Sequence, residues 1–230
     1  MLRSLSYICP MKRFLPFIFI LLALGFFCLV FIFTNQKKEV FKVLPILGNH
    51  RLDTSMVNNV EQIDTLYHSI PAFRFIDQDG RSVNQSVVKN KVYVADFFFT
   101  TCQTICPVMS KQLDRVYKAY SDNPQVMILS HTVDPETDSP EQLKKYALDL
   151  NANTSRWIFL TGEKADLYRQ ARTGYLLNAD EGDGGHEDFI HTQNFALVDK
   201  KGRIRGFYDG TLTDEVDQLI TDIGFLLQEN

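Results

Sequence analysis

Apolar and polar residues follow two different periods along this chain, and each period predicts a different kind of element. Short apolar or alternating runs bounded by turn residues predict strands, and the most apolar of them reaches from Val92 to Phe99. Longer runs with apolar residues on one side predict helices. The predicted strands cover residues 70–76, 82–83, 91–99, 126–133, 156–160, 193–198 and 204–208, and the predicted helices cover 107–121, 139–150, 163–172 and 213–227.

The order of the predicted elements is β-β-α-β-α-β-α-β-β-α, which is typical of an α/β protein. Strands that alternate with helices and then end in a hairpin and a helix predict one domain, with a central mixed sheet flanked by helices. Turn and cap residues agree with this order. Asp77-Gln78-Asp79-Gly80 predicts a hairpin turn, and Ser139-Pro140 predicts the start of a helix.

The N-terminal part of the chain has a different pattern. Residues 14–33 (FLPFIFILLALGFFCLVFIF) contain no charged side chain, and a helix of this length spans roughly 30 Å, the thickness of a bilayer core. A cleaved signal peptide has a shorter apolar region of about 7–15 residues and then small residues, whereas Thr34-Asn35-Gln36 follows here. The pattern therefore predicts an uncleaved transmembrane helix. Cys28 is then a membrane-facing side chain, and Cys9 is assigned no role.

These observations divide the chain into four parts: an N-terminal tail (1–13), a transmembrane anchor (14–33), a stalk or linker without firm periodicity (34–65) and a folded domain (66–230).

The charge of the chain is unevenly distributed. The whole chain has 24 basic residues (Lys and Arg) and 28 acidic residues (Asp and Glu), of which six basic residues and one acidic residue lie in residues 1–42. Residues 43–230 therefore hold 18 basic and 27 acidic residues, and their net charge is −9. An acidic domain lacks the basic face that phosphate contacts need, which argues against nucleic acid as a partner.

Two cysteines follow the strand at 91–99 and stand at the start of the next predicted helix. Cys102 and Cys106 are four residues apart, so they can converge at the helix N-terminus, where free N–H groups and the helix dipole favour a thiolate. Two such sulfurs can close into a disulfide or hold a metal ion. Dithiol exchange usually uses two intervening residues, and here there are three. Two thiolates with one imidazole form a ligand set for copper, so both uses stay open.

Five histidines are available to complete such a ligand set. Three of them are predicted to be solvated: His50, His68 and His186. His131 stands inside an apolar strand and is predicted to be a core residue. His191 directly precedes the strand that starts at Gln193, and in a thioredoxin-like sheet the loop before that strand faces the cysteine loop. His191 is therefore the predicted imidazole ligand.

Several motifs together resemble the Sco/SenC family. They are residues 97–107 (FFFTTCQTICP), residues 132–141 (TVDPETDSPE), His191-Thr192 and residues 197–202 (LVDKKG). Members of this family are membrane-anchored, thioredoxin-fold copper proteins that assist assembly of the Cu(A) centre of cytochrome c oxidase. The resemblance covers roughly residues 66–230 and implies Cys102, Cys106 and His191 as copper ligands. It also implies that Asp134 lies near the site and orients a ligand or a partner.

The resemblance implies a copper metallochaperone rather than an enzyme. A single-pass anchor would hold the soluble domain on the outer or periplasmic face of a membrane. The expected partners are a copper donor and the cytochrome c oxidase subunit that carries Cu(A). Gln103 follows the first cysteine, where many family members have proline.

The alternative, from a different class, is a thiol–disulfide oxidoreductase that keeps the cysteines of a partner reduced. It would use Cys102 and Cys106 as a redox-active pair and would not need His191. A peroxide-reducing thiol enzyme or redox sensor is a weaker third hypothesis, because the sequence shows no combination of Thr and Arg beside Cys102.

Overall fold

The computed structural model describes residues 15–34, 42–57, 60–177 and 192–229, and the chain divides into two compact units, Met1–Phe41 and Lys42–Asn230. The first unit contains helix α1 (Leu15–Thr34), which occupies the predicted anchor segment. Side chains of α1 are described at residues 19–28, 30 and 31. Within the described part of the chain, no helix is long and apolar enough to cross a membrane.

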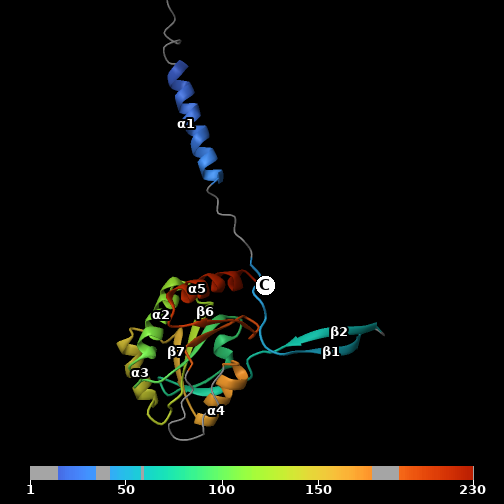
Figure 1. Ribbon diagram of the computed structural model, residues 1–230, viewed down its shortest axis with the longest axis vertical. Coiled ribbons are helices and arrows are strands. Elements are labelled where there is room, and N and C mark those ends of the chain that lie inside the picture. The colour runs from blue at the N-terminus through green and yellow to red at the C-terminus, as the bar shows by residue number, and fades with distance from the viewer. Residues whose placement is uncertain (1–14, 35–41, 58–59, 178–191, 230) are drawn as a thin grey trace, which may run out of the picture. The chain divides into compact units, whose positions relative to one another are not determined.

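The second unit is built on a seven-stranded mixed sheet with the strand order β4-β3-β7-β6-β5-β8-β9 (Figure 1). β5 pairs in parallel with β6, and β6 with β7, whereas the other pairs are antiparallel. This arrangement confirms the predicted central mixed sheet. The strands are β3 (Arg74–Asp77), β4 (Ser82–Asn84), β5 (Val92–Phe98), β6 (Val126–Thr132), β7 (Trp157–Thr161), β8 (Asn194–Val198) and β9 (Ile204–Asp209).

Helices cover both faces of this sheet. The side chains of the interior strand β5 are therefore all buried, and its apolar residues alternate between two hydrophobic clusters. Val94 and Phe98 belong to the cluster that includes α2, α3 and α5, whereas Tyr93 and Phe97 belong to the cluster that includes α4. The helices are α2 (Ile105–Ala119), α3 (Pro140–Asp149), α4 (Lys164–Arg169) and α5 (Thr213–Gln228). Figure 1 shows α2 and α3 on one side of the sheet and α4 on the other.

The predicted cap and turn residues act as expected. The Ser139 hydroxyl caps α3 by accepting a hydrogen bond from the Gln142 N–H at 3.3 Å. Gly80 and Gly202 stand in the two hairpin turns with φ of 75° and 76°, in the left-handed region that glycine adopts without strain.

Three segments differ from the prediction. The predicted stalk contains a two-stranded antiparallel sheet made of β1 (His50–Val57) and β2 (Val60–Tyr67). Its apolar residues are separated by charged and polar ones, so the sequence carries no continuous strand signal there. The helix predicted at 163–172 ends as α4 at Arg169 and continues as a π-helical segment, η3 (Gln170–Gly174). A short 3₁₀ turn, η2 (Gln85–Val88), was not predicted either.

A buried arginine ties both ends of the second unit to the sheet. Arg205 on β9 is 2% exposed, and its guanidinium donates to the backbone oxygens of Leu44 and Pro45, where the chain enters the unit. It also donates to the carboxylates of Asp199, at 3.0 Å, and Glu229, at 2.6 Å. Glu229 directly follows α5, so one side chain joins the entry segment, the β8–β9 turn and the C-terminal helix.

Replacing Arg205 by alanine is expected to lower the free energy of unfolding of residues 42–230 by about 3 kcal/mol, because two carboxylates and two carbonyls lose their buried donor. Urea unfolding followed by circular dichroism measures the loss. Lys118→Ala is the control, since it breaks an exposed ion pair with Asp114 and should cost only about 0.2–1 kcal/mol. Equal losses in the two variants would contradict the role of Arg205.

Candidate metal and thiol site

The cysteine loop connects the end of β5 to the start of α2. The Cys102 N–H donates to the Phe99 carbonyl at 3.2 Å, which turns the chain back at the end of the strand. The Cys106 N–H, in the first turn of α2, donates to Cys102 Sγ at 3.4 Å. The Cys102 sulfur therefore satisfies an amide that the helix N-terminus would leave free, while the side chain of the N-cap residue Thr104 makes no such bond. The structure brings the two cysteines together as their spacing predicts.

The two thiols have different environments. Cys106 is 3% exposed, and this burial, together with its hydrogen bond to Cys102, raises the pKa of Cys106 from 9.0 to about 12. Burial also acts to raise the pKa of Cys102, but hydrogen bonds from Cys106 and Thr104 outweigh it and lower that pKa to about 7. At neutral pH the partly exposed Cys102 is therefore about half thiolate, whereas the buried Cys106 is a thiol.

A buried carboxyl holds the start of the cysteine loop against the neighbouring strand. Asp138 is fully buried and accepts hydrogen bonds from the N–H of Thr100, at 3.1 Å, from the Thr100 hydroxyl and from the Thr132 hydroxyl. Thr132 ends β6, and Thr100 lies two residues before Cys102. In the sequence, Asp138 stands out only as part of the motif at residues 132–141. Its role depends on a contact with a residue 38 positions away, which no local pattern reveals.

Asp134, predicted to lie near the site, begins the loop that contains Asp138. It is partly exposed, and its backbone carbonyl accepts hydrogen bonds from the N–H groups of Thr137 and Asp138. Its own N–H donates to the Thr132 hydroxyl at 3.0 Å. These backbone contacts shape the loop, and the predicted action of the Asp134 side chain on a ligand or partner stays a prediction.

A second buried carboxyl lies beneath the cysteines. Asp96 on β5 is 2% exposed, and Ser130 donates a hydrogen bond to it while accepting one from Trp157 Nε1 at 2.9 Å. Burial raises the pKa of Asp96 to about 7. The charge of Asp96 also raises the pKa of Cys106, which adds to the effect of burial in keeping that thiol protonated. A single acidic residue inside an apolar strand was the only sign of this group in the sequence.

Three of the five histidines are described, and two of them behave as predicted. His131 is confirmed as a core residue, because it is fully buried and its ring stacks on that of Phe97 with the ring centroids 4.8 Å apart. This burial lowers the pKa of His131 to about 4. His50 is exposed, as predicted. The prediction that His68 is solvated is wrong. Its Nε2 lies 2.7 Å from the Gly174 carbonyl oxygen and the side chain is partly buried.

The predicted ligand His191, like His186, lies outside the described residues. The next residue, Thr192, is buried, and its hydroxyl accepts a hydrogen bond from the Asn194 N–H at the start of β8. Among the residues that the structure does describe, no three His, Cys, Asp or Glu side chains form a group that could hold a metal ion.

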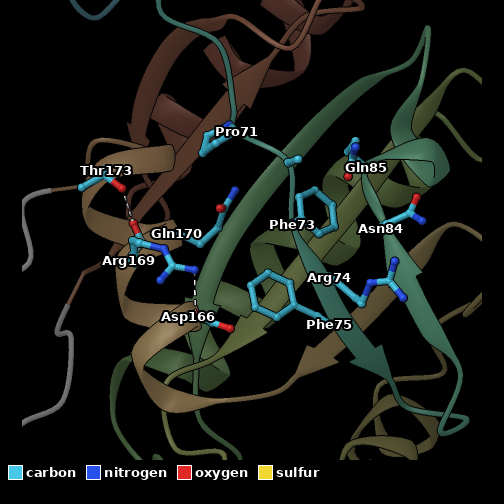
Figure 2. Close-up of a pocket in the computed structure, with 11 residues that line it drawn as sticks. Pro71, Phe73, Arg74, Phe75, Asn84, Gln85, Asp166, Arg169, Gln170 and Thr173 are labelled. Atoms are coloured by element: carbon cyan, nitrogen blue, oxygen red, sulfur yellow. Dashed lines mark hydrogen bonds and ion pairs between the residues drawn. The ribbon is translucent and has the colours of Figure 1, made fainter.

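A separate hollow of about 540 Å³ opens on the α4 side of the sheet (Figure 2). The rings of Phe73 and Phe75 stack at its wall with centroids 5.5 Å apart, and Arg169 pairs with Asp166 beside them. None of the cysteines and histidines that the structure describes lines this hollow, so it is distinct from the thiol site.

The pKa of Cys102 predicts the pH dependence of its alkylation. In the reduced protein, the rate of reaction with iodoacetamide should rise with pH to a midpoint near 7, because only the thiolate reacts and the lowered pKa populates it at lower pH. Cys106 should stay unmodified in the same range. Mass spectrometry of the alkylated peptides measures both rates. A Cys102 midpoint near 9, or faster modification of Cys106, would contradict this description.

The contacts of Asp138 predict that it holds Cys102 in its low-pKa position. Asp138→Ala should move the midpoint of Cys102 alkylation from about 7 toward 9, because the loop no longer holds the sulfur on the Cys106 N–H. The unfolding free energy should also fall by roughly 2–3 kcal/mol, since buried donors lose a charged partner. Asp149→Ala, an exposed position on α3, is the control. Destabilisation without a shifted midpoint would reduce Asp138 to a purely structural residue.

Several known proteins are similar to the second unit in sequence and in fold. A SCO1 protein homologue from Bacillus subtilis is 35% identical over 162 residues, covering 70% of this chain and 83% of the relative. The crystal structure of a SCO1/SenC family lipoprotein from Bacillus anthracis matches with a TM-score of 0.63 at 31% identity, covering 70% of this chain and 96% of that chain. BsSco, described as a member of the Sco family of cytochrome c oxidase assembly proteins with a disulfide switch, matches with a TM-score of 0.61 at 32% identity, covering 71% and 95%.

The same fold extends to more distant proteins. ScoI from Bradyrhizobium japonicum, whose structure was solved with copper bound, has a TM-score of 0.56 at 23% identity and covers 69% of this chain and 99% of that chain. That likeness shows the thioredoxin-like fold alone. Residues 62–227, well over half of the chain, match the SCO1/SenC family as a whole. With the predicted fold and the paired cysteines in place, this protein is a member of the SCO1/SenC family.

Proposed function

We propose that this protein is a membrane-anchored copper metallochaperone that delivers copper to, or prepares, the Cu(A) site of a cytochrome c oxidase subunit. The observation that carries the proposal is the pair of sulfurs at the N-terminus of α2, where the Cys106 N–H donates to Cys102 Sγ at 3.4 Å. Thiolates are soft ligands that favour Cu(I) over harder divalent cations. The description of BsSco as a member of the Sco family of cytochrome c oxidase assembly proteins supports the same partner.

Cys102, Cys106 and His191 are the proposed copper ligands. β8 runs antiparallel to β5, with Ala196 opposite Ala95, so the chain just before β8 returns to the end of β5 that carries the cysteines. The buried position of Thr192 supports this approach. One imidazole with two thiolates suits both Cu(I) and Cu(II). Asp134 is proposed to orient a ligand or a partner from the neighbouring loop.

Copper is the cargo in this proposal, and the two sulfurs have different roles in its exchange. Cys102 is partly exposed and already about half thiolate at neutral pH, so its sulfur is the one that meets an incoming donor first. Cys106 must lose its proton when it binds metal, since the ligand is the thiolate. Its raised pKa makes protons compete strongly for that sulfur, which favours release when the cysteines of a partner replace the ligands one at a time.

The proposal includes the membrane anchor and the order of parts along the chain. Residues 14–33 lack charge over a length that matches a bilayer core, which supports a single-pass anchor with the folded part, 66–230, on the outer or periplasmic face. The lipoprotein relative supports association with a membrane. The segment 34–65 then connects the anchor to the copper-binding domain.

A thiol–disulfide oxidoreductase is the second candidate, and the unequal pKa values of the two thiols favour it. Cys102, the thiolate, would attack a disulfide of the partner, and Cys106 would then attack the mixed disulfide. The partner gains two thiols and two electrons, and Cys102–Cys106 becomes a disulfide that an external dithiol must reduce. This function needs no imidazole, so it is independent of His191.

Copper titration of the reduced fragment 42–230 under anaerobic conditions tests the proposed ligand set. Wild type should bind one copper per chain, and the Cu(II) form should show a sulfur-to-copper charge-transfer absorption band. His191→Ala should weaken binding by at least the 10–100-fold that loss of an outer-shell partner costs, and should shift or abolish the band. His50→Ala, at an exposed histidine on β1, is the matched control and should leave both unchanged.

The same experiment separates the two candidate functions. Failure of the wild type to bind copper tightly, together with ready cycling of Cys102 and Cys106 by a dithiol, would replace the chaperone by the oxidoreductase. An unchanged band in His191→Ala would remove His191 from the ligand set.

A further inference from the structure

A second hollow, at the opposite end of β5 from the cysteines, carries a concentration of positive charge on an acidic domain. It has a volume of about 340 Å³, and among its lining residues that the structure describes three are lysines and none is acidic. We call it the lysine hollow. Its residues are Ile70, Phe73, Gln85, Ser86, Val88, Lys89, Asn90, Tyr93, Lys200, Lys201 and Gly202. Because β5 has seven residues, this end of the sheet lies at least roughly 20 Å from the cysteine loop.

The positive charge of the lysine hollow is not neutralised by the carboxylates around it. Asp199 pairs with Arg203 and Arg205, and Glu229 pairs with Arg205. Lys200 donates to the backbone oxygens of Leu227 and Glu229, which fixes its position without cancelling its charge. Within the described ranges, Lys89 and Lys201 make no ion pair, and both side chains are exposed.

The floor of the hollow is apolar. The side chains of Val88 and Tyr93 are at least nine-tenths buried, and Phe73 is 7% exposed. A site for inorganic phosphate alone would need donors around a small volume, whereas this one combines an apolar floor of roughly headgroup size with a rim of lysines. The combination fits an amphiphile that has one anionic group.

The chain enters the domain beside this hollow. The Leu47 N–H donates to the Ile204 carbonyl at 2.8 Å, and the Ile70 N–H donates to the Gly202 carbonyl at 2.7 Å. Arg205 holds the carbonyls of Leu44 and Pro45 at the same end. Nine residues lie between Thr34, the end of α1, and Leu44, and this length of chain reaches at most about 35 Å.

We propose that the lysine hollow binds the headgroup of an anionic phospholipid at the membrane surface, and so turns the cysteine loop away from the bilayer. This inference rests on the membrane anchoring proposed above. The phosphate lies between Lys89 and Lys201, and the glycerol end of the lipid contacts the apolar floor. The net charge of −9 on residues 43–230 adds to the orientation, because an anionic surface attracts the lysine hollow and repels the rest of the domain.

Lysine acetylation on the full chain tests this proposal. The chain is reconstituted in vesicles of phosphatidylcholine alone and in vesicles that contain about one third phosphatidylglycerol. We expect Lys89 and Lys201 to be acetylated about fivefold more slowly in the second vesicles, which is the effect of one lysine at an anionic surface. Lys111 and Lys145, exposed lysines on α2 and α3, should react equally in both. Mass spectrometry gives the rate at each lysine.

Two variants connect the protection to the hollow. Lys89→Gln should abolish most of the protection of Lys201, whereas the matched variant Lys111→Gln should leave it unchanged. Equal rates for Lys201 in the two kinds of vesicle, on chains that float with both, would overturn the lysine hollow and leave the anchor standing. Chains that float with neither vesicle would overturn the anchoring, and this inference with it, while the copper titration would still test the ligand set.

Discussion

The hydrogen bond from the Cys106 N–H to Cys102 Sγ is the interaction on which the rest of the site depends. It places a sulfur at the helix end where backbone dipoles stabilise negative charge, so that one thiol is partly ionised without any cationic side chain. That bond exists only if the six residues between β5 and α2 keep one conformation. Two features of the fold stabilise this conformation. β5, which precedes the loop, is buried along its whole length, and Asp138 holds Thr100 against the end of β6 through hydrogen bonds.

The same arrangement makes the two sulfurs chemically unequal. Cys106 points into the cluster formed by α2, α3 and α5, above the buried Asp96, whereas Cys102 stays at the surface of the loop. A carrier must bind its cargo strongly enough to exclude water and weakly enough to give it up. In the proposed carrier, a thiolate that is available at neutral pH next to a thiol that resists ionisation would meet both needs, and the same pair of thiols is what a redox role would use.

Much of this molecule could be read from the sequence, and the physical reason differs from element to element. β5 and β6 are buried on both faces, so their mainly apolar runs were visible, and Ser139 signals a helix start through chemistry confined to four residues. The pairing of Cys102 and Cys106 follows from helical spacing alone. What the sequence did not show depends on distant partners or on mixed composition. His68 is held by Gly174, 106 residues away, and the β1–β2 hairpin has polar residues interspersed with apolar ones.

The two ends of β5 have opposite chemistry, and the sheet keeps them apart. One end carries sulfur that attracts a soft cation, and the other carries lysines beside the segment through which the chain enters the domain. β5 has seven residues and pairs with β6 on one side and β8 on the other, so the sheet holds these two ends apart. In the proposed function, copper exchange with a membrane-embedded oxidase requires a carrier that is confined near the bilayer and still presents its cargo outward. A strand that carries the proposed lipid contact at one end and the proposed copper site at the other would satisfy both requirements.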